Sequence, residues 1–287
     1  MSAFSFTVEI AGIRIRIESP RRMDIPPELR PFIIEGSEAH EVYEIELIHE
    51  PMVFDRPPVY SSTGLRVYPY EDATYRELRH LQATDGCTAV CCLRQNGHHS
   101  LYIPARDWER YERNCTLSVL LAPEALFLRH SGFLLHSSVV RYQGQGILFF
   151  GASGTGKSTQ AALWEQYQGA EILNGDRCVI RKLGDDFYGS GSPYCGSSGI
   201  YRRESVPISA LILPVHGAEN RIELMTPEAA LHRIYRECLV NLWDTEFMNK
   251  LFDLLQALVL RVPVYMLHGR PDAQATEIAR RAIFGGD

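Results

Sequence analysis

Residues 151–158 of the chain are Gly-Ala-Ser-Gly-Thr-Gly-Lys-Ser. This stretch matches the phosphate-binding pattern Gly-x-x-x-x-Gly-Lys-Ser/Thr at every defined position. An apolar run, Ile147 to Phe150, precedes it, and a run with helical character begins at Thr159. A buried strand, a glycine-rich loop and a helix in this order are the known context of the pattern. The stretch therefore predicts an α/β fold built around a phosphate site.

Each residue type in the loop has a chemical role. Glycines let the backbone turn so that successive N–H groups point at a phosphate, and the N-terminus of the following helix adds positive potential. We expect Lys157 to reach the β- and γ-phosphates of a nucleotide and the Ser158 hydroxyl to ligate Mg²⁺. The predicted nucleotide contacts are Ser153, Gly154, Thr155, Gly156, Lys157, Ser158 and Thr159.

Phosphoryl transfer also needs a carboxylate near the metal ion and the acceptor. The segment from Glu171 to Asp176 is a short apolar strand that ends in an acid. Parallel α/β sheets present ligand groups at the carboxyl ends of their strands. Asp176 is therefore predicted to hold Mg²⁺, directly or through water, and to accept the proton of the acceptor hydroxyl. A turn or helix-capping role for Asp176 is the alternative.

Several neighbouring features have two interpretations each. His136 lies in the apolar run before the loop, where an adjacent strand would place it beside the phosphates, but a hydrogen-bonded core histidine fits equally well. The glycine-rich stretch 189–199 is interpreted as a mobile loop over the acceptor, with a solvated hairpin as the alternative. Arg202 and Arg203 follow this stretch and could supply charge to a phosphate, although surface arginines seldom do.

The hydropathy pattern divides the chain into two parts. Residues 1–105 alternate apolar and polar residues in short runs separated by turns, which predicts a mostly antiparallel β unit. The strands expected there lie within a hairpin over 4–17 and at 42–48, 65–68, 88–93 and 100–103. Residues 106–287 alternate strands with helices, which predicts an α/β catalytic domain. Its expected strands are 133–140, 147–150, 171–176, 210–213 and 262–267, and its helices are 107–129 with a break or restart at Pro123, a run from Thr226 to about 260, and 271–284.

Composition and charge exclude several classes of protein. Hydrophobic residues make up 45% of the 287 positions, so a packed core is expected. The net charge of −6 argues against a broad nucleic-acid surface, and no apolar run has the length of a membrane span. The cysteines are odd in number and form no CxxC pair, which predicts a reducing cytoplasm rather than disulfides or a zinc site. They are Cys87, Cys91, Cys92, Cys115, Cys178, Cys195 and Cys238.

The stretch from about Leu134 to Leu213 resembles the kinase domain of the HPr kinase/phosphorylase family. The matching features are a histidine (His136) before the loop, a loop of the form Gly-x-Ser-Gly-x-Gly-Lys-Ser, and Asp176-Arg177 on the next strand. These bacterial serine kinases share a P-loop core with phosphoenolpyruvate carboxykinase. The layout is also similar to small HPr-kinase-like proteins, some of which phosphorylate a serine of lasso peptides. The resemblance implies a P-loop kinase core of this type over roughly the last 150 residues.

The chain departs from this family at two places. Gly175 stands where the family has the first of two adjacent aspartates, and the family's Glu-Ile-Arg-Gly segment is absent, with Tyr194-Cys195-Gly196-Ser197 near that place. One carboxylate would then have to serve both the metal ion and the proton, unless His136 assists. HPr itself is therefore not the expected acceptor.

These observations predict an ATP- and Mg²⁺-dependent kinase that transfers the γ-phosphoryl group to a serine hydroxyl of a peptide or protein, a ribosomal natural-product peptide included. Asp176, His136 and Lys157 are the predicted catalytic residues, and Ser158 and Asp176 the predicted metal ligands. Two alternatives stay open: a nucleotide-gated peptide-binding module without transfer activity, and a small-molecule kinase acting, for example, on free serine. Nucleic acid and membrane are not expected partners, and a homo-oligomer and a preference for ATP or GTP stay open.

Overall fold

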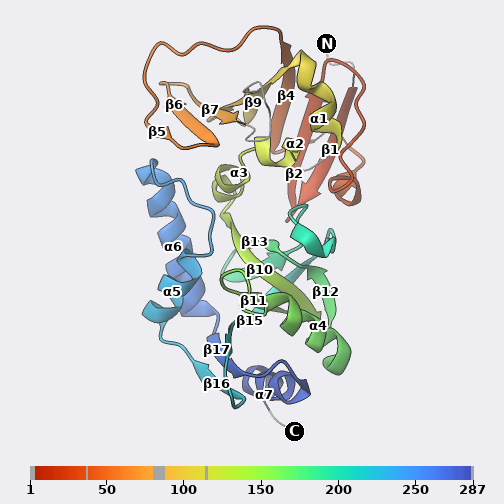
Figure 1. Ribbon diagram of the computed structural model, residues 1–287, viewed down its shortest axis with the longest axis vertical. Coiled ribbons are helices and arrows are strands. Elements are labelled where there is room, and N and C mark those ends of the chain that lie inside the picture. Colours follow the sequence, from red (N-terminus) through yellow and green to blue (C-terminus); the bar gives the residue numbers. More distant parts are fainter. Residues whose placement is uncertain (1–3, 37, 80–87, 114–115, 286–287) are drawn as a thin grey trace. The chain divides into compact units, whose positions relative to one another are not determined.

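A computed structural model describes residues 4–36, 38–79, 88–113 and 116–285 (Figure 1). The protein is of the mixed α/β class and has two β-sheets. The chain divides into two compact units, Met1–Pro123 and Glu124–Asp287. The division falls after Pro123, whereas the sequence pattern placed a boundary after residue 105. The short helices α1 (Trp108–Arg113) and α2 (Thr116–Leu120) thus go with the first unit.

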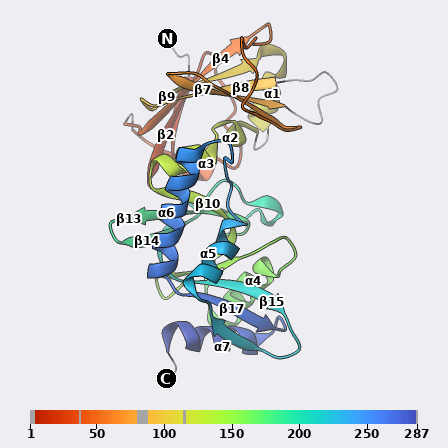
Figure 2. The same ribbon diagram turned by 90° about the vertical axis from the view of Figure 1, so that its left-hand side faces the viewer.

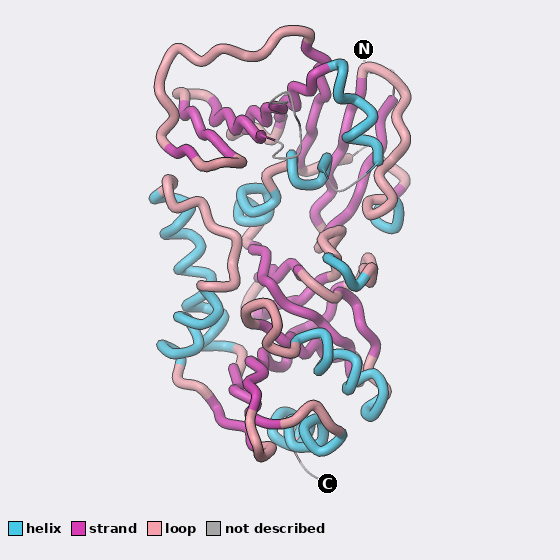
Figure 3. Tube along the Cα trace, in the orientation of Figure 1, coloured by secondary structure: helices cyan, strands magenta, loops and turns pink. Residues whose placement is uncertain are grey.

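The first unit is built on a sheet that has nine strands in the described residues, in the order β3-β1-β2-β4-β9-β8-β7-β6-β5. Most neighbours are antiparallel, but β4 runs parallel to both β2 and β9. Figure 3 shows how few helical segments accompany these strands. The strands are β1 (Phe4–Ile10), β2 (Ile13–Ser19), β3 (Ile33–Ile34), β4 (Glu41–Ile48), β5 (Tyr60–Ser61), β6 (Leu65–Pro69), β7 (Ala73–Arg79), β8 (Thr88–Arg94) and β9 (His98–Pro104), with 3-10 turns η1 (Arg30–Phe32) and η2 (Ala105–Asp107).

The predicted hairpin at the start of the chain is confirmed. Ala11 and Gly12 have φ angles of 52° and 74°, and two positive φ values suit the tight turns that join twisted strands. On β2 the alternate isoleucines Ile13, Ile15 and Ile17 are fully buried. The strand β7 was not predicted, because its sequence, ATYRELR, is mostly polar and only two of its seven residues are buried.

The sheet of the second unit joins a parallel centre to antiparallel flanks. Strand β11 pairs parallel to β15, and β15 pairs parallel to β17, while the remaining pairings are antiparallel. Its strands are β10 (Gly132–Tyr142), β11 (Gln145–Phe150), β12 (Glu171–Asn174), β13 (Arg177–Leu183), β14 (Asp186–Ser190), β15 (Ser205–His216), β16 (Arg221–Leu224) and β17 (Val264–Gly269). Its helices are α3 (Pro123–Arg129), α4 (Lys157–Gln168), α5 (Pro227–Tyr235), α6 (Thr245–Arg261) and α7 (Ala273–Phe284), with the 3-10 turn η3 (Gly196–Ser198).

Successive side chains of β11 point to opposite faces of this sheet, and each face carries its own hydrophobic core. Ile147 and Phe149 belong to a cluster with Trp164 of α4 and two alanines of α7. Leu148 and Phe150 belong to a second cluster that includes the apolar faces of α5 and α6. Figure 2 faces α5 and α6, and α4 lies behind them. The strand that leads into the loop at residue 151 is thus buried from both sides, as its continuous apolar sequence predicts.

Helix ends follow the expected capping chemistry. The Thr226 hydroxyl accepts a hydrogen bond from the backbone N–H of Ala229, as predicted, and a new helix starts at Pro123. The apolar run to about residue 260 is two helices rather than one, because Asp244 caps the start of α6. No helix in the described ranges combines the length and apolar content needed to cross a membrane.

The described cysteines are not joined in disulfides: these are Cys91, Cys92, Cys178, Cys195 and Cys238. Cys87 and Cys115 lie outside the described residues, as does Gly286 of the predicted C-terminal cap.

Trp164 is expected to be essential for the position of α4. Its ring is fully buried, with ring centroids 5.4 Å from Tyr142 and 6.3 Å from Phe149. Trp164→Ala should lower the free energy of unfolding by about 3–5 kcal/mol, measured by urea denaturation. Tyr167→Ala on the same helix is the control, because Tyr167 is 49% exposed and its loss should change stability by no more than about 0.5 kcal/mol. Equal losses in the two variants would contradict this placement.

Candidate functional site

The glycine-rich loop connects β11 to α4 in a conformation that depends on glycine. Gly151 has a φ of 134°, and a Cβ atom there would lie 2.8 Å from Leu213 Cδ1. Gly156 is the N-cap of α4 with a φ of 97°. Residues with side chains rarely adopt either conformation. The loop therefore turns at both ends, at the two positions where the sequence pattern requires glycine.

Lys157 holds the loop closed from within. Its side chain is 7% exposed, and its Nζ donates hydrogen bonds to the carbonyl oxygens of Gly151 at 2.8 Å and Ala152 at 3.0 Å. The ammonium group thus has backbone partners on one side of the loop. The Lys157 side chain therefore places its positive charge inside the loop, beside the backbone amides that would bind a phosphate.

The N-terminus of α4 differs from the other helices of the second unit. Side-chain oxygens of Thr226, Asp244 and Asp272 cap α5, α6 and α7, whereas no side chain caps α4. The first amides of a helix need an acceptor. The hydroxyl of exposed Ser158 also makes no hydrogen bond to another described residue. This end of α4 can therefore accept an anion at its amides.

Two carboxylates flank His136 beside this loop. The Nε2 atom of His136 lies 3.3 Å from Asp176 Oδ1, and its Nδ1 atom lies 3.3 Å from Glu237 Oε2. The backbone also ties the segments together, because the His136 N–H donates to the Glu237 carbonyl at 2.9 Å. His136 and Asp176 were both singled out in the sequence, and they are adjacent. Glu237 was missed.

Glu237 was not predicted from the sequence because of its position in the chain. It follows α5, roughly a hundred residues after His136 in sequence, in a segment without a motif. It reaches the site because Cys238 forms an isolated β-bridge with Leu135 on β10. No sequence pattern predicts a bridge of a single residue pair.

Asp176 is positioned by the turn between β12 and β13. Its N–H donates to Asn174 Oδ1 at 3.0 Å, and its carbonyl accepts from the Ser137 N–H at 2.8 Å. Asn174 is fully buried and anchored in turn by its Nδ2, which donates to the Ser192 carbonyl at 3.0 Å. The turn is thus held on both sides, and the Asp176 side chain is one-third exposed.

The glycine-rich stretch 189–199 begins as the end of β14 and then packs against this turn. The Arg177 N–H donates to the Tyr194 carbonyl at 3.1 Å. A Cβ atom on Gly196 would lie 2.7 Å from Asp176 Cγ, so a glycine is needed beside the carboxylate. Arg202 forms an ion pair with Glu171 at the start of β12 and takes part in a structural network with Arg141.

Ser198 packs so closely against Gly175 that no side chain fits at position 175. A Cβ atom on Gly175 would lie 2.5 Å from the Cβ atom of Ser198. Ser198 therefore occupies the space that a side chain at 175 would need. The second carboxylate of this site is instead Glu237, which approaches from the opposite ring nitrogen of His136.

Burial and charge shift the ionisation of two site residues. Burial lowers the pKa of His136 from its usual 6.5, and the positive charge of Lys157 lowers it further, while the charges of Asp176 and Glu237 oppose the shift. The imidazole is therefore neutral at pH 7 and carries one N–H. Burial also lowers the pKa of Lys157, against the charges of Glu237 and Asp176. These groups are close enough to act on one another electrostatically.

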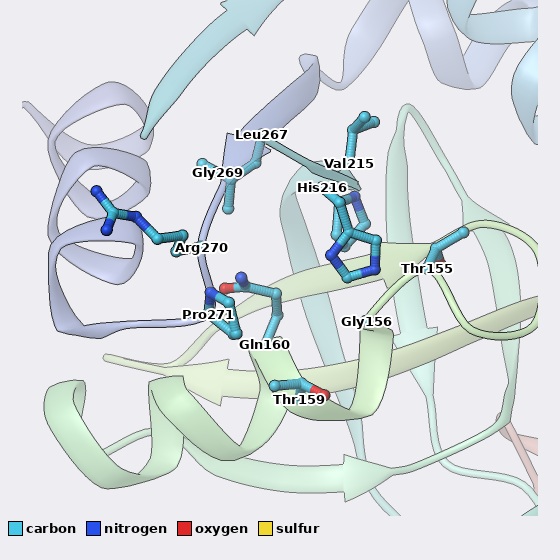
Figure 4. Close-up of a pocket in the computed structure, with 11 residues that line it drawn as sticks. Thr155, Gly156, Thr159, Gln160, Val215, His216, Leu267, Gly269, Arg270 and Pro271 are labelled. Atoms are coloured by element: carbon cyan, nitrogen blue, oxygen red, sulfur yellow. The ribbon is translucent and has the colours of Figure 1, made fainter. Parts of the chain in front are cut away.

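Two cavities adjoin the loop and share a wall formed by Thr155 and 214–216. The smaller, of about 50 Å³, lies between the first turn of α4 and the ends of β15 and β17. In Figure 4 the Gln160 side chain extends from α4 toward Pro271. The Oε1 atom of Gln160 is buried and has no hydrogen-bond partner among the described residues. It is therefore available to a donor group of a ligand.

The larger cavity, of about 290 Å³, lies on the side of the loop where Glu237 is found. Its lining includes Gly151, Ala152, Thr155, Arg233, Arg236 and Glu237. Glu237, in the wall of this cavity, also lies 3.3 Å from His136 Nδ1.

Within the described part of the chain, no group of three or more His, Cys, Asp and Glu side chains is arranged to hold a metal ion. Mg²⁺ in phosphoryl-transfer sites commonly takes one or two protein ligands together with phosphate oxygens and water. Ser158 and Asp176 supply the hard oxygen atoms that such a metal ion prefers.

No protein-family model matches the chain, and no curated protein matches it. Among solved structures, the Hpr(Ser) kinase/phosphatase from Coxiella burnetii is similar over 52% of this chain and 95% of its own, with 11% sequence identity and a TM-score of 0.31. A similarity at this TM-score carries no argument about fold or activity. Membership of the HPr kinase family therefore stays a prediction.

The packing of Ser198 against Gly175 predicts a coupled pair of substitutions. Gly175→Ala should lower the free energy of unfolding by about 1–3 kcal/mol, because the new methyl group displaces the loop at Ser198. Ser198→Gly alone should have a small effect, and in the double variant it should restore most of the loss. A double-mutant cycle by thermal or urea unfolding measures the coupling. Additive effects would show that the two positions do not compete for space.

Proposed function

We propose that the protein is an ATP- and Mg²⁺-dependent kinase that transfers the γ-phosphoryl group to a serine hydroxyl of a peptide or protein. The observation that carries this proposal is the juxtaposition of an uncapped helix N-terminus and Lys157 with a chain of Asp176, His136 and Glu237. The first part suits a bound phosphate and the second suits removal of a proton. Phosphoryl transfer to a hydroxyl needs both.

The residues present fit a nucleotide. The uncapped amides of α4 and the loop from Ser153 to Thr159 offer donors for phosphate oxygens. The buried, unpartnered Oε1 of Gln160 offers an acceptor beside them, in the smaller cavity, for a donor of the ribose or base. We therefore assign the phosphates to the loop, while the smaller cavity, of about 50 Å³, has room for a single donor group beside Gln160 rather than for a whole base or ribose.

The residues also fit a metal ion and a proton acceptor. MgATP, when bound, supplies the phosphoryl group and partly neutralises its charge. Ser158 and Asp176 would hold the metal ion. Asp176 accepts the proton of the acceptor hydroxyl, directly or with His136, whose neutral ring can take up or pass on a proton. Glu237 orients His136 through Nδ1 and compensates for the aspartate that Gly175 replaces.

The choice of serine and of a peptide or protein as acceptor is supported by the sequence resemblance to HPr-kinase-like proteins. A ribosomal natural-product peptide is one acceptor of this class. We also propose a cytoplasmic location, on the odd number and scattered positions of the cysteines in the sequence.

The test is transfer of the γ-phosphate to serine peptides, followed by mass spectrometry, with nucleotide binding measured separately by calorimetry. Asp176→Asn should lower transfer by roughly 10²- to 10⁴-fold while ATP still binds, because the proton acceptor is lost. Lys157→Ala should weaken ATP binding itself. Asp253→Asn, an exposed aspartate on α6, is the control and should leave transfer unchanged.

Other outcomes point to other functions. Transfer at the normal rate by Asp176→Asn would refute the role of this carboxylate. Tight nucleotide binding without transfer to any acceptor would favour a nucleotide-gated peptide-binding module. Phosphorylation of free serine in preference to serine peptides would favour a small-molecule kinase. If calorimetry detects no binding of ATP or GTP in the presence of magnesium, the kinase proposal is refuted.

Glu237 gives a separate prediction for a residue that acts through His136. Glu237→Gln preserves the shape of the side chain but removes its charge, so His136 is less firmly oriented. We expect kcat to fall on the order of tenfold, equivalent to about 1.4 kcal/mol in the barrier, with little change in the KM for ATP. Steady-state kinetics measure both values. Glu228→Gln, at an exposed position of α5, should leave kcat unchanged.

A further inference from the structure

Two arginines at the end of α5 face the larger cavity without a partner. Arg233 and Arg236 are exposed and line the cavity of about 290 Å³ beside the loop. Neither forms an ion pair or hydrogen bond with another described residue. By contrast, exposed Arg261 is paired with Asp186, and exposed Arg281 with Glu277. This pair therefore presents uncompensated positive charge to the cavity.

Stabilisation of helix α5 explains the presence of only one of these two arginines. One basic side chain in the last turn of a helix interacts favourably with the helix dipole, and Arg233 lies in that turn. A second arginine three residues later adds repulsion between like charges. The carboxylate closest in sequence, Glu237, is 3.3 Å from His136 Nδ1. An anion in the cavity would stabilise both guanidinium groups.

The larger cavity borders both the loop and Glu237. It shares Gly151, Ala152 and Thr155 with the loop, and Glu237 in its wall contacts the histidine that reaches Asp176. The buried Oε1 atom of Gln160 belongs to the other, smaller cavity. A molecule in the larger cavity would therefore lie against the loop and against Glu237.

We infer that Arg233 and Arg236 bind a carboxylate side chain of the acceptor peptide, so that the protein selects serines with a nearby Asp or Glu. This inference rests on the proposed kinase function and specifies its substrate class. The forked guanidinium group matches a carboxylate in geometry and charge. An acidic residue near the serine would orient the hydroxyl toward Asp176.

The test uses a peptide library with one central serine, blocked ends and each neighbouring position varied in turn. The wild-type protein should phosphorylate peptides with Asp or Glu at one position roughly tenfold faster than those with Asn or Gln. Arg233→Gln and Arg236→Gln should each reduce this preference, and the double variant should abolish it. Rates on neutral peptides and ATP affinity should stay unchanged. Arg221→Gln, an exposed arginine on β16, is the matched control and should keep the preference.

Charge reversal separates recognition from a structural effect. Arg236→Glu should shift the preference toward Lys or Arg at the same peptide position, which loss of folding cannot produce. Because both arginines are exposed, the circular dichroism spectra and melting temperatures of the variants should match those of the wild type.

The outcomes distinguish this inference from the proposed function. Equal rates on acidic and neutral peptides, or a preference that persists in the double variant, would overturn the inference and leave the kinase proposal intact. A uniform fall in kcat on all peptides would also overturn it, since the arginines would then act on the transferred group. Absence of transfer to every peptide would overturn the peptide-kinase proposal and this inference with it.

Discussion

The site depends on the hydrogen bonds of the Lys157 ammonium group to the Gly151 and Ala152 carbonyls. These two bonds tie the first residue of α4 to the start of the loop. The loop can take this shape because Gly151 lies against Leu213 without a side chain. It can hold the shape because the strand before it and the helix after it are packed into buried cores.

Strand β10 brings the rest of the site to this loop. It pairs with β11 along one edge, and with β12 and β13 along the other. Since β11 and β12 are both antiparallel to β10, they run in the same direction, and their carboxyl ends meet at one edge of the sheet. Asp176 follows β12 there and His136 lies on β10 opposite Arg177. Strand β10 is antiparallel to both β11 and β12, and it brings His136 to the same end of the sheet as Asp176.

Charge in the site is arranged so that each group has a distinct role. Lys157 and the α4 amides are positive on the loop side, and Asp176 and Glu237 are negative on either side of His136. Burial keeps His136 neutral at pH 7. Arg177, 4.0 Å from Asp176, adds positive charge on the side of that carboxylate. Beyond Glu237, Arg233 and Arg236 are the unpartnered arginines of the larger cavity among the described residues.

The amino-acid sequence by itself determined the elements whose signals are local: the turn at Ala11-Gly12, the buried strand before residue 151, the loop, and the start of α5 at Thr226. It also singled out Asp176, because an acid at the end of a short strand is a local feature. Tertiary structure alone decided that Glu237 joins His136, that Ser198 fills the space beside Gly175, and that Arg233 and Arg236 face a cavity. Those outcomes depend on pairings between residues far apart in the chain, and such pairings are set by the packing of the whole sheet, which no local pattern records.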